Sequence, residues 1–161
     1  MTKNHKLRIA WAILAQSATV DQQSNNLSLV NIIERLNLNQ SPIASPAELD
    51  TLPLVDLPQK AFVRTSYCLA VLAESETGFP SDVRPQIRLV VTNPVGELIN
   101  EQVHDLEKPE PGSKTVRTIF NFDAILVDKS GYYTFTTSMK FAHDKEYSEK
   151  YSTKMDVRIY A

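Results

Sequence analysis

Alternation of apolar and polar residues with a period of two is the feature that most constrains the fold of this chain. Successive side chains of a β-strand point to opposite sides of a sheet, so this alternation predicts strands with one buried face. It recurs in segments rich in Val, Ile, Thr, Tyr and Phe, which pack well on a pleated surface. These segments are residues 62–74, 86–92, 115–127, 131–139 and 154–160.

The alternation also assigns side chains to faces in two of the longer segments. In segment 62–74 it predicts one face made of Val63, Thr65, Tyr67, Leu69 and Val71. Cys68 falls on the other face of that segment, beside Ser66 and Ala70. In segment 115–127 it predicts one face made of Val116, Thr118, Phe120, Phe122, Ala124 and Leu126.

Residues 13–36 hold two apolar runs around a polar stretch, and their periodicity fits either helices or strands. A helix would place Leu29, Ile32, Ile33 and Leu36 on one side. We favour two strands, because the second run is rich in β-branched residues and neither run has a convincing capping box or C-terminal glycine. Residues 21–26 then form a hairpin loop in which Asn25 and Asn26 can adopt the left-handed conformation.

Turn chemistry agrees with a β protein. Each of the four glycines lies in a turn-like context, and the stretches NPVG and DKSG separate predicted strands. About eight short strands joined by such turns predict a mostly-β chain that folds as an antiparallel two-layer β-sandwich, immunoglobulin-like or jelly-roll-like. The length of 161 residues fits a single domain over residues 1–161.

The connection between residues 37 and 60 is different, because it carries four prolines and no strand pattern. We expect it to cross between the two sheets, with one short helical turn over residues 45–49. Its apolar residues exceed what a solvated loop needs, and those left outside would form a partner-facing patch. The candidates for this patch are Leu52, Leu54, Val55 and Leu57. The alternative is that the apolar residues of the segment simply close the core.

Composition limits the classes of partner and the compartment. The net charge is −2 without a basic cluster, so we expect no nucleic-acid binding. The longest apolar run, Ile9–Ala15, is too short to span a membrane, and one cysteine cannot form an internal disulfide. We therefore expect a cytoplasmic protein. A signal peptide over residues 1–17 is the alternative, but its apolar stretch is minimal and it continues smoothly into a predicted strand.

No catalytic motif is recognisable, so we expect no catalytic residue, no metal site and no cofactor. The three histidines, His5, His104 and His143, do not have the spacing of metal ligands. Cys68 has no neighbouring base that would activate it, and we expect a buried, unreactive thiol in the core. The carboxylates are scattered along the sequence and give no positive support for acid–base catalysis.

Tyrosines are the most distinctive residues near the predicted turns. Tyr132, Tyr147 and Tyr151 could form a binding platform at one end of the sandwich, because tyrosine offers a large contact area at a low entropic cost. The alternative is that these rings cover the edges of the sheets.

Three stretches together resemble a family of small bacterial proteins of unknown function: residues 12–36, IRLVVTNPVGELI and GYYTFTTSM. Ala15 stands where that family often has cysteine. The resemblance implies a β-sandwich and supplies no catalytic residues. Our leading hypothesis is a non-catalytic sandwich that acts through protein–protein contacts, as an assembly or accessory component that binds a protein partner or itself. A small-ligand or glycan-binding sandwich is the second hypothesis, and a hydrolase or metal-dependent enzyme is the third.

Overall fold

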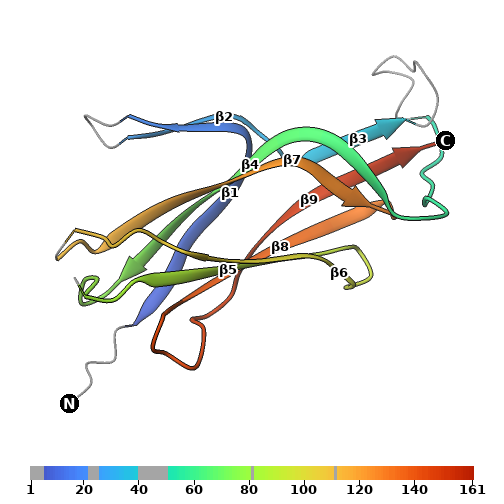
Figure 1. The fold of residues 1–161 in the computed structure, drawn as a ribbon. Helices are drawn as coiled ribbons and strands as arrows, with labels where there is room; N and C mark the ends of the chain where they lie inside the picture. Colours follow the sequence, from blue (N-terminus) through green and yellow to red (C-terminus); the bar gives the residue numbers. More distant parts are fainter. Residues whose placement is uncertain (1–5, 22–25, 40–50, 81, 111) are drawn as a thin grey trace.

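The chain forms two β-sheets in a computed structural model that describes residues 6–21, 26–39, 51–80, 82–110 and 112–161. These residues contain nine strands and no helix, which confirms the predicted all-β fold with one strand more than expected. Sheet A has the order β2-β1-β4-β7, and sheet B has the order β3-β9-β8-β5-β6 (Figure 1). The strands are β1 Leu7–Val20, β2 Leu27–Ile32, β3 Arg35–Asn39, β4 Ala61–Ser75, β5 Pro85–Thr92, β6 Leu98–Asp105, β7 Thr115–Val127, β8 Gly131–Phe141 and β9 Tyr151–Tyr160.

One hydrophobic core lies between the sheets and takes side chains from both. Leu69 of β4, Ile87 of β5 and Phe135 of β8 are all fully buried in it. The rings of Tyr67 and Phe135 meet edge to face across the two sheets, with their centres 6.2 Å apart. Burial in β5 alternates residue by residue, as the sequence pattern predicts for a strand with one face in the core.

The two apolar runs of residues 13–36 form strands, as predicted, but the second run belongs to both sheets. β2 pairs with β1 as an antiparallel hairpin, and β3 pairs with β9 in parallel. Between them, the Ile33 amide donates to Leu14 in sheet A at 2.9 Å, and Glu34 accepts the Asp156 amide in sheet B at 2.8 Å. The chain therefore crosses from one sheet to the other within two residues, which a periodic pattern cannot reveal.

The hairpin of β1 and β2 stands apart from the rest of sheet A. β1 pairs with β4 only from Leu7 to Ala15, and from Ala15 to Val20 it pairs with β2. Figure 1 shows a sharp bend in β1, after which the hairpin leads away from β4. The Asp21 amide donates to the Asn26 carbonyl at 2.9 Å and closes the hairpin, whereas Asn25 lies outside the described residues.

In β7 the predicted face is correct for its first half and wrong for its second. Phe122 is buried as expected, but after it the buried residues are Ile125 and Val127 rather than Ala124 and Leu126. The pairing of β4 with β7 shifts register in this region. From Arg64 to Tyr67 β4 advances three residues while β7 advances two, so the extra residue of this β-bulge lies in β4. Burial in β4 keeps alternating across it, and the reversal appears in β7. Nothing in the apolar pattern marks such a bulge.

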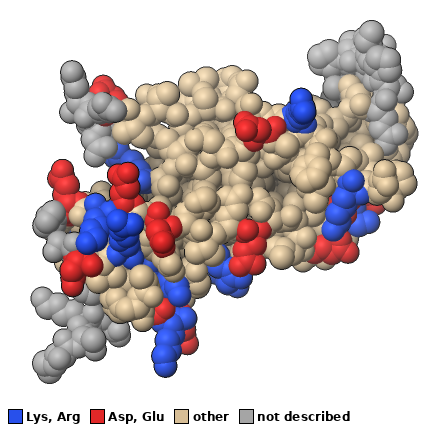
Figure 2. All heavy atoms as spheres, viewed as in Figure 1, with Lys and Arg blue, Asp and Glu red and all other residues tan. Residues whose placement is uncertain are grey.

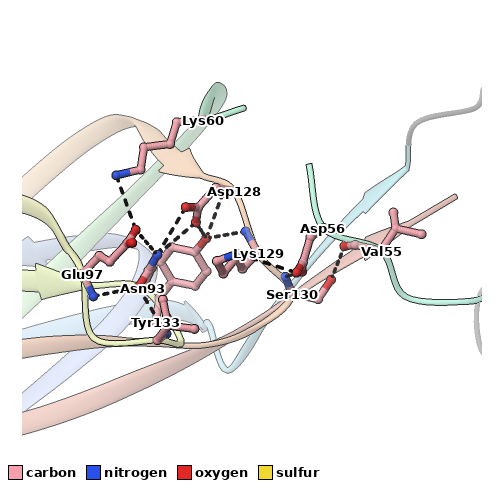
Figure 3. A network of polar contacts seen from close by, with 10 residues as sticks. Val55, Asp56, Lys60, Asn93, Glu97, Asp128, Lys129, Ser130 and Tyr133 are labelled. Atoms are coloured by element: carbon pink, nitrogen blue, oxygen red, sulfur yellow. Dashed lines mark hydrogen bonds and ion pairs between the residues drawn. The ribbon is translucent and has the colours of Figure 1, made fainter. Parts of the chain in front are cut away.

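A buried tyrosine fixes the connection between β7 and β8 (Figure 3). The Tyr133 hydroxyl donates to Asp128 Oδ1 at 3.1 Å and accepts the amides of Asp128 at 3.0 Å and Lys129 at 3.2 Å. This arrangement is the tyrosine corner of immunoglobulin-like sandwiches. The strand order agrees, because β4 lies beside β7 in one sheet and β5, β8 and β9 are neighbours in the other. The sandwich is therefore immunoglobulin-like rather than jelly-roll-like.

The described part of the connection from β3 to β4 is tied to this corner. The Leu57 amide donates to the Asp128 carbonyl at 2.7 Å, and the Val55 amide donates to the Ile159 carbonyl at 2.8 Å. The Ser130 hydroxyl donates to the Val55 carbonyl at 2.9 Å (Figure 3). The connection crosses from sheet B to sheet A, as expected, and the predicted helical turn at 45–49 lies outside the described residues.

Candidate functional site

The outward side of sheet B is polar, as the solvated face of a sandwich should be. Its neighbouring strands are joined by side-chain hydrogen bonds. Gln86 Nε2 donates to Asp105 Oδ1 at 2.7 Å, and Arg88 Nε donates to Glu101 Oε1 at 2.8 Å. The Thr136 hydroxyl lies 3.0 Å from that of Ser152. This side is mostly polar, although Leu98 and Val103 of the outermost strand β6 are exposed on it.

The outward side of sheet A is apolar over its centre. We call this area the outer patch. It consists of Trp11, Ile13, Ile32, Leu72 and Ile119 around the small residues Ala15, Cys68 and Ala70. The register joins them directly across four strands. Trp11 pairs with Leu72, and Ala15 pairs with Ile32 on one side and Cys68 on the other. Ala70 pairs with Ile13 on one side and with Ile119 on the other.

A β-bulge turns the tryptophan outward. The register of β1 against β4 shifts between Ile9 and Trp11, so Ala10 is an extra residue in β1. Ile9 is buried in the core, and two residues later Trp11 would face the core too if the alternation were unbroken. With the extra residue, Ala12 and Leu14 enter the core instead, and Trp11 and Ile13 face outward. β-Bulges commonly redirect a side chain in this way.

Small residues form the floor of the outer patch. Ala15, Cys68 and Ala70 are 0%, 1% and 0% exposed, although none of them belongs to the core cluster between the sheets. Cys68 is buried, as predicted, but on the outward side of the sheet rather than in the core. Its burial raises the pKa of the thiol, and a hydrogen bond with the backbone of Ala15 opposes this in part.

Polar residues border the outer patch at both ends. At one end Arg8 Nη2 contacts Glu74 Oε2 at 2.6 Å across the strands β1 and β4. At the other end the exposed residues Ser17 and Ser66 follow on the same side. On the face visible in Figure 2, charged side chains gather mainly towards one end, and the middle carries few. An apolar centre with a polar rim is the usual anatomy of a protein interface.

The outer patch continues onto the hairpin, where its member Ile32 and the neighbouring Val30 are strongly exposed. Val30 and Ile32 of β2 are 48% and 61% exposed, and they extend the apolar surface onto the hairpin. Sequence reasoning missed the whole surface, yet a signal was present. The runs WAILA and CLAVLA are apolar at consecutive positions, which indicates strands that bury both faces.

The candidate partner surface in the connection does not form one patch. Val55 and Leu57 pack against the core, and Leu52 is half-buried. Leu54 is 51% exposed and forms an isolated bridge with Tyr160 of β9. For Val55 and Leu57 the structure therefore agrees with the alternative interpretation, in which the segment closes the core.

The three candidate tyrosines are also separated. Tyr132 lies at the start of β8, 59% exposed, with Lys154 Nζ 5.8 Å from its ring centre. Tyr147 follows the end of β8, and the charged groups of Arg88 and Lys140 lie 5.7 Å and 5.0 Å from its ring centre. Tyr151 packs against the core. Tyr132 and Tyr147 thus occupy opposite ends of one strand and cannot share a platform.

A cleft of about 350 Å³ opens beside Tyr147, at the start of β1 and the end of β8. Its lining is mostly charged, with both signs present: Lys6, Arg8, Glu76, Lys140, Asp144, Glu146 and Glu149. Its volume lies at the lower end of the range for small-ligand sites, but such sites are usually lined by apolar residues. A small polar ligand is the kind of molecule that this lining could hold.

The histidines within the described residues have aromatic neighbours. The His104 ring lies 5.2 Å from that of Phe120, and the His143 ring stacks on Phe141 at 5.9 Å. His5 lies outside the described residues. Within the described ranges, no group of three or more His, Cys, Asp and Glu side chains is placed to hold a metal ion.

No protein-family model matches this chain, and a search of curated proteins finds no significant match. The resemblance to a family of small bacterial proteins remains a prediction. In the part of the chain that the structure covers, no helix is long and apolar enough to cross a membrane.

Proposed function

We propose that this protein is a non-catalytic β-sandwich that acts through protein–protein contacts made by the outer patch. The difference between the two outward sides of the sandwich carries the proposal. An antiparallel sheet that packs one face on a core usually shows a polar face to water, and sheet B does so. Sheet A instead presents Trp11, Ile13, Leu72 and Ile119. Contiguous apolar surface of this kind marks interaction sites in folded proteins.

The composition of the outer patch supports a contact with another protein. Tryptophan is enriched among the residues that dominate binding energy, and Trp11 is the only tryptophan of the chain. Ala15, Cys68 and Ala70 are already covered by the larger side chains around them, so a partner would contact those larger side chains. The Arg8–Glu74 ion pair supplies part of the polar rim that surrounds such centres.

The biological role that fits this proposal is that of an assembly or accessory component. Its compartment would be the cytoplasm. A single cysteine held as a buried thiol suits a reducing environment.

The test places a photo-cross-linking amino acid at Ile119 in the outer patch and, as a control, at Thr136 on the outward side of sheet B. Each variant is produced in cells at native level, irradiated, and analysed by mass spectrometry. The proposal predicts a reproducible cross-linked protein from position 119 and none from position 136. Equal cross-linking from both positions, or none from position 119, would contradict it.

Binding of a small polar ligand or glycan is a second candidate, which rests on the cleft beside Tyr147. Tyr147 lines this cleft, and the charged groups of Arg88 and Lys140 near its ring help to hold it in position. Titration with a panel of sugars and small anions, followed by NMR, tests it. This candidate predicts changes in the chemical shifts of residues that line the cleft, and no such changes in Tyr147→Ala. If no resonance moves, the sugars and anions of the panel are excluded as ligands.

A further inference from the structure

We propose that β2 is a dimerisation edge, and that a second copy of this chain pairs with it in antiparallel orientation about a two-fold axis. This inference goes beyond the proposed function, because the contact would use the edge of sheet A rather than its outward side. It would join the two four-stranded sheets into one sheet of eight strands. The outer patches of the two copies would then lie side by side on one surface.

The first observation is that β2 is an outermost strand with an open edge. Among the described strands it pairs only with β1, and Figure 1 shows it on the side of the hairpin that faces away from β4. Unpaired backbone amides and carbonyls at such an edge can pair with another strand. Val30 and Ile32 are among its most exposed side chains, although both are apolar.

The second observation concerns charge. Charged side chains and prolines on outermost strands normally prevent pairing with other molecules. The other three outermost strands of the described sheets follow this rule: β3 contains Arg35, β6 contains Glu101 and Asp105, and β7 contains Arg117 and Asp123. The sequence of β2, LSLVNI, contains neither a charge nor a proline.

The lack of charge favours a second copy over an unrelated partner. When a strand pairs with its own copy in antiparallel orientation, each residue faces residues of the same strand. Like charges directly opposite each other destabilise such a pair, and β2 has none to oppose. A different protein could not recognise this edge by charge complementarity, because β2 carries no charged side chain.

Symmetry explains why the contact would stop at two copies. An axis perpendicular to the sheet makes each β2 both donor and acceptor to the other, so the pairing uses up the open edge in both molecules. Asn31 has a φ of 52°, which interrupts the extended conformation. Direct partners in an antiparallel pair share a side of the sheet, so a two-fold axis at Leu29 would place Val30 of each copy opposite Ser28 of the other. So short a pairing predicts a weak dimer that forms as the concentration rises.

The test measures mass against concentration for the full chain by analytical ultracentrifugation. We expect a shift from monomer to dimer. Val30→Lys should weaken the dimer by about tenfold or more, because the two introduced charges would be diagonal neighbours on the same side of the sheet. Val103→Lys is the matched control, since Val103 is 50% exposed on the outermost strand β6 and Val30 is 48% exposed on β2. It should leave the dimer intact.

A mixture of Val30→Lys and Val30→Glu provides a rescue that does not depend on either variant alone. Opposite charges should restore a heterodimer if the two β2 strands meet. A wild-type chain that stays monomeric, a dimer that Val30→Lys does not weaken, or a failed rescue would overturn β2 pairing. The proposed function would stand after any of these results if Ile119 still cross-linked to a different protein. Failure of β2 pairing can therefore be told apart from failure of the proposed function.

Discussion

Trp11 and Leu72 lie directly opposite each other on β1 and β4, and both side chains face away from the core. Their sequence neighbours Ala12 and Val71 form the next pair and fill the core instead. Two adjacent cross-strand pairs are thus apolar on opposite sides of one sheet. The outward side of sheet B is mostly polar at its centre, where Arg88, Thr136 and Ser152 lie. This difference between the two outward sides is the basis of the proposed contact surface.

Leucines on the two sides of β4 should differ in their contribution to stability. Leu69 is fully buried between the sheets, so Leu69→Ala should lower the free energy of unfolding by about 2–5 kcal/mol. Leu72 is only partly buried on the outward side, and Leu72→Ala should cost about 1 kcal/mol or less. Urea unfolding of both variants measures the difference. Equal losses would place Leu72 in the core and remove it from the outer patch.

The sequence predicts most of the fold and little of the outer patch, for one physical reason. Alternation reports which residues share a side of a strand, and a β-bulge reverses that assignment without leaving a mark in composition. The bulge at Ala10 therefore hid the outward position of Trp11, and the register shift near Phe122 misplaced Leu126. An apolar side chain that faces a partner also looks the same in sequence as one that faces the core.

The Tyr133 hydroxyl should contribute strongly to the stability of the fold. Tyr133→Phe leaves the buried amide of Asp128 and its carboxylate without their hydroxyl partner. Leaving such groups unsatisfied costs about 1–3 kcal/mol, so the midpoint of urea unfolding should fall by the corresponding amount. The neighbouring Tyr132→Phe is the control, because Tyr132 is 59% exposed, and its effect should lie within about 0.5 kcal/mol. Equal effects would mean that the corner does not stabilise the connection.

Cys68 should react slowly with thiol reagents while the chain is folded. Burial raises the pKa of its thiol, so at a given mildly alkaline pH the folded protein holds less thiolate than the unfolded chain does. Because the unfolded chain loses the proton first, the stability linked to this group is complete below the ordinary thiol pKa. It declines as the pH rises through the raised value. Labelling rates with and without urea check this, and rapid labelling of the native protein would show that the floor of the outer patch is open.

The outer patch and the outward side of sheet B should tolerate charge differently. Ile119→Lys should remove the contact that Ile119 makes with a partner, and Thr136→Lys should not, while both variants keep the melting temperature of the parent within a few degrees. Gel filtration of freshly prepared lysates compares the mass of the complexes that contain each variant. Loss of the complex in both variants, or in neither, would mean that the contact does not use sheet A.

Oxidative footprinting of Trp11 tests the contact surface most directly. Hydroxyl radicals modify exposed aromatic side chains, and the extent of modification can be read for Trp11 by mass spectrometry in intact cells and in the dilute purified protein. Tyr132 on sheet B is an internal control in the same molecule. We predict that Trp11 is modified in the purified protein and protected in cells, whereas Tyr132 is modified equally in both. Equal modification of Trp11 in both samples would contradict a protein contact at the outer patch.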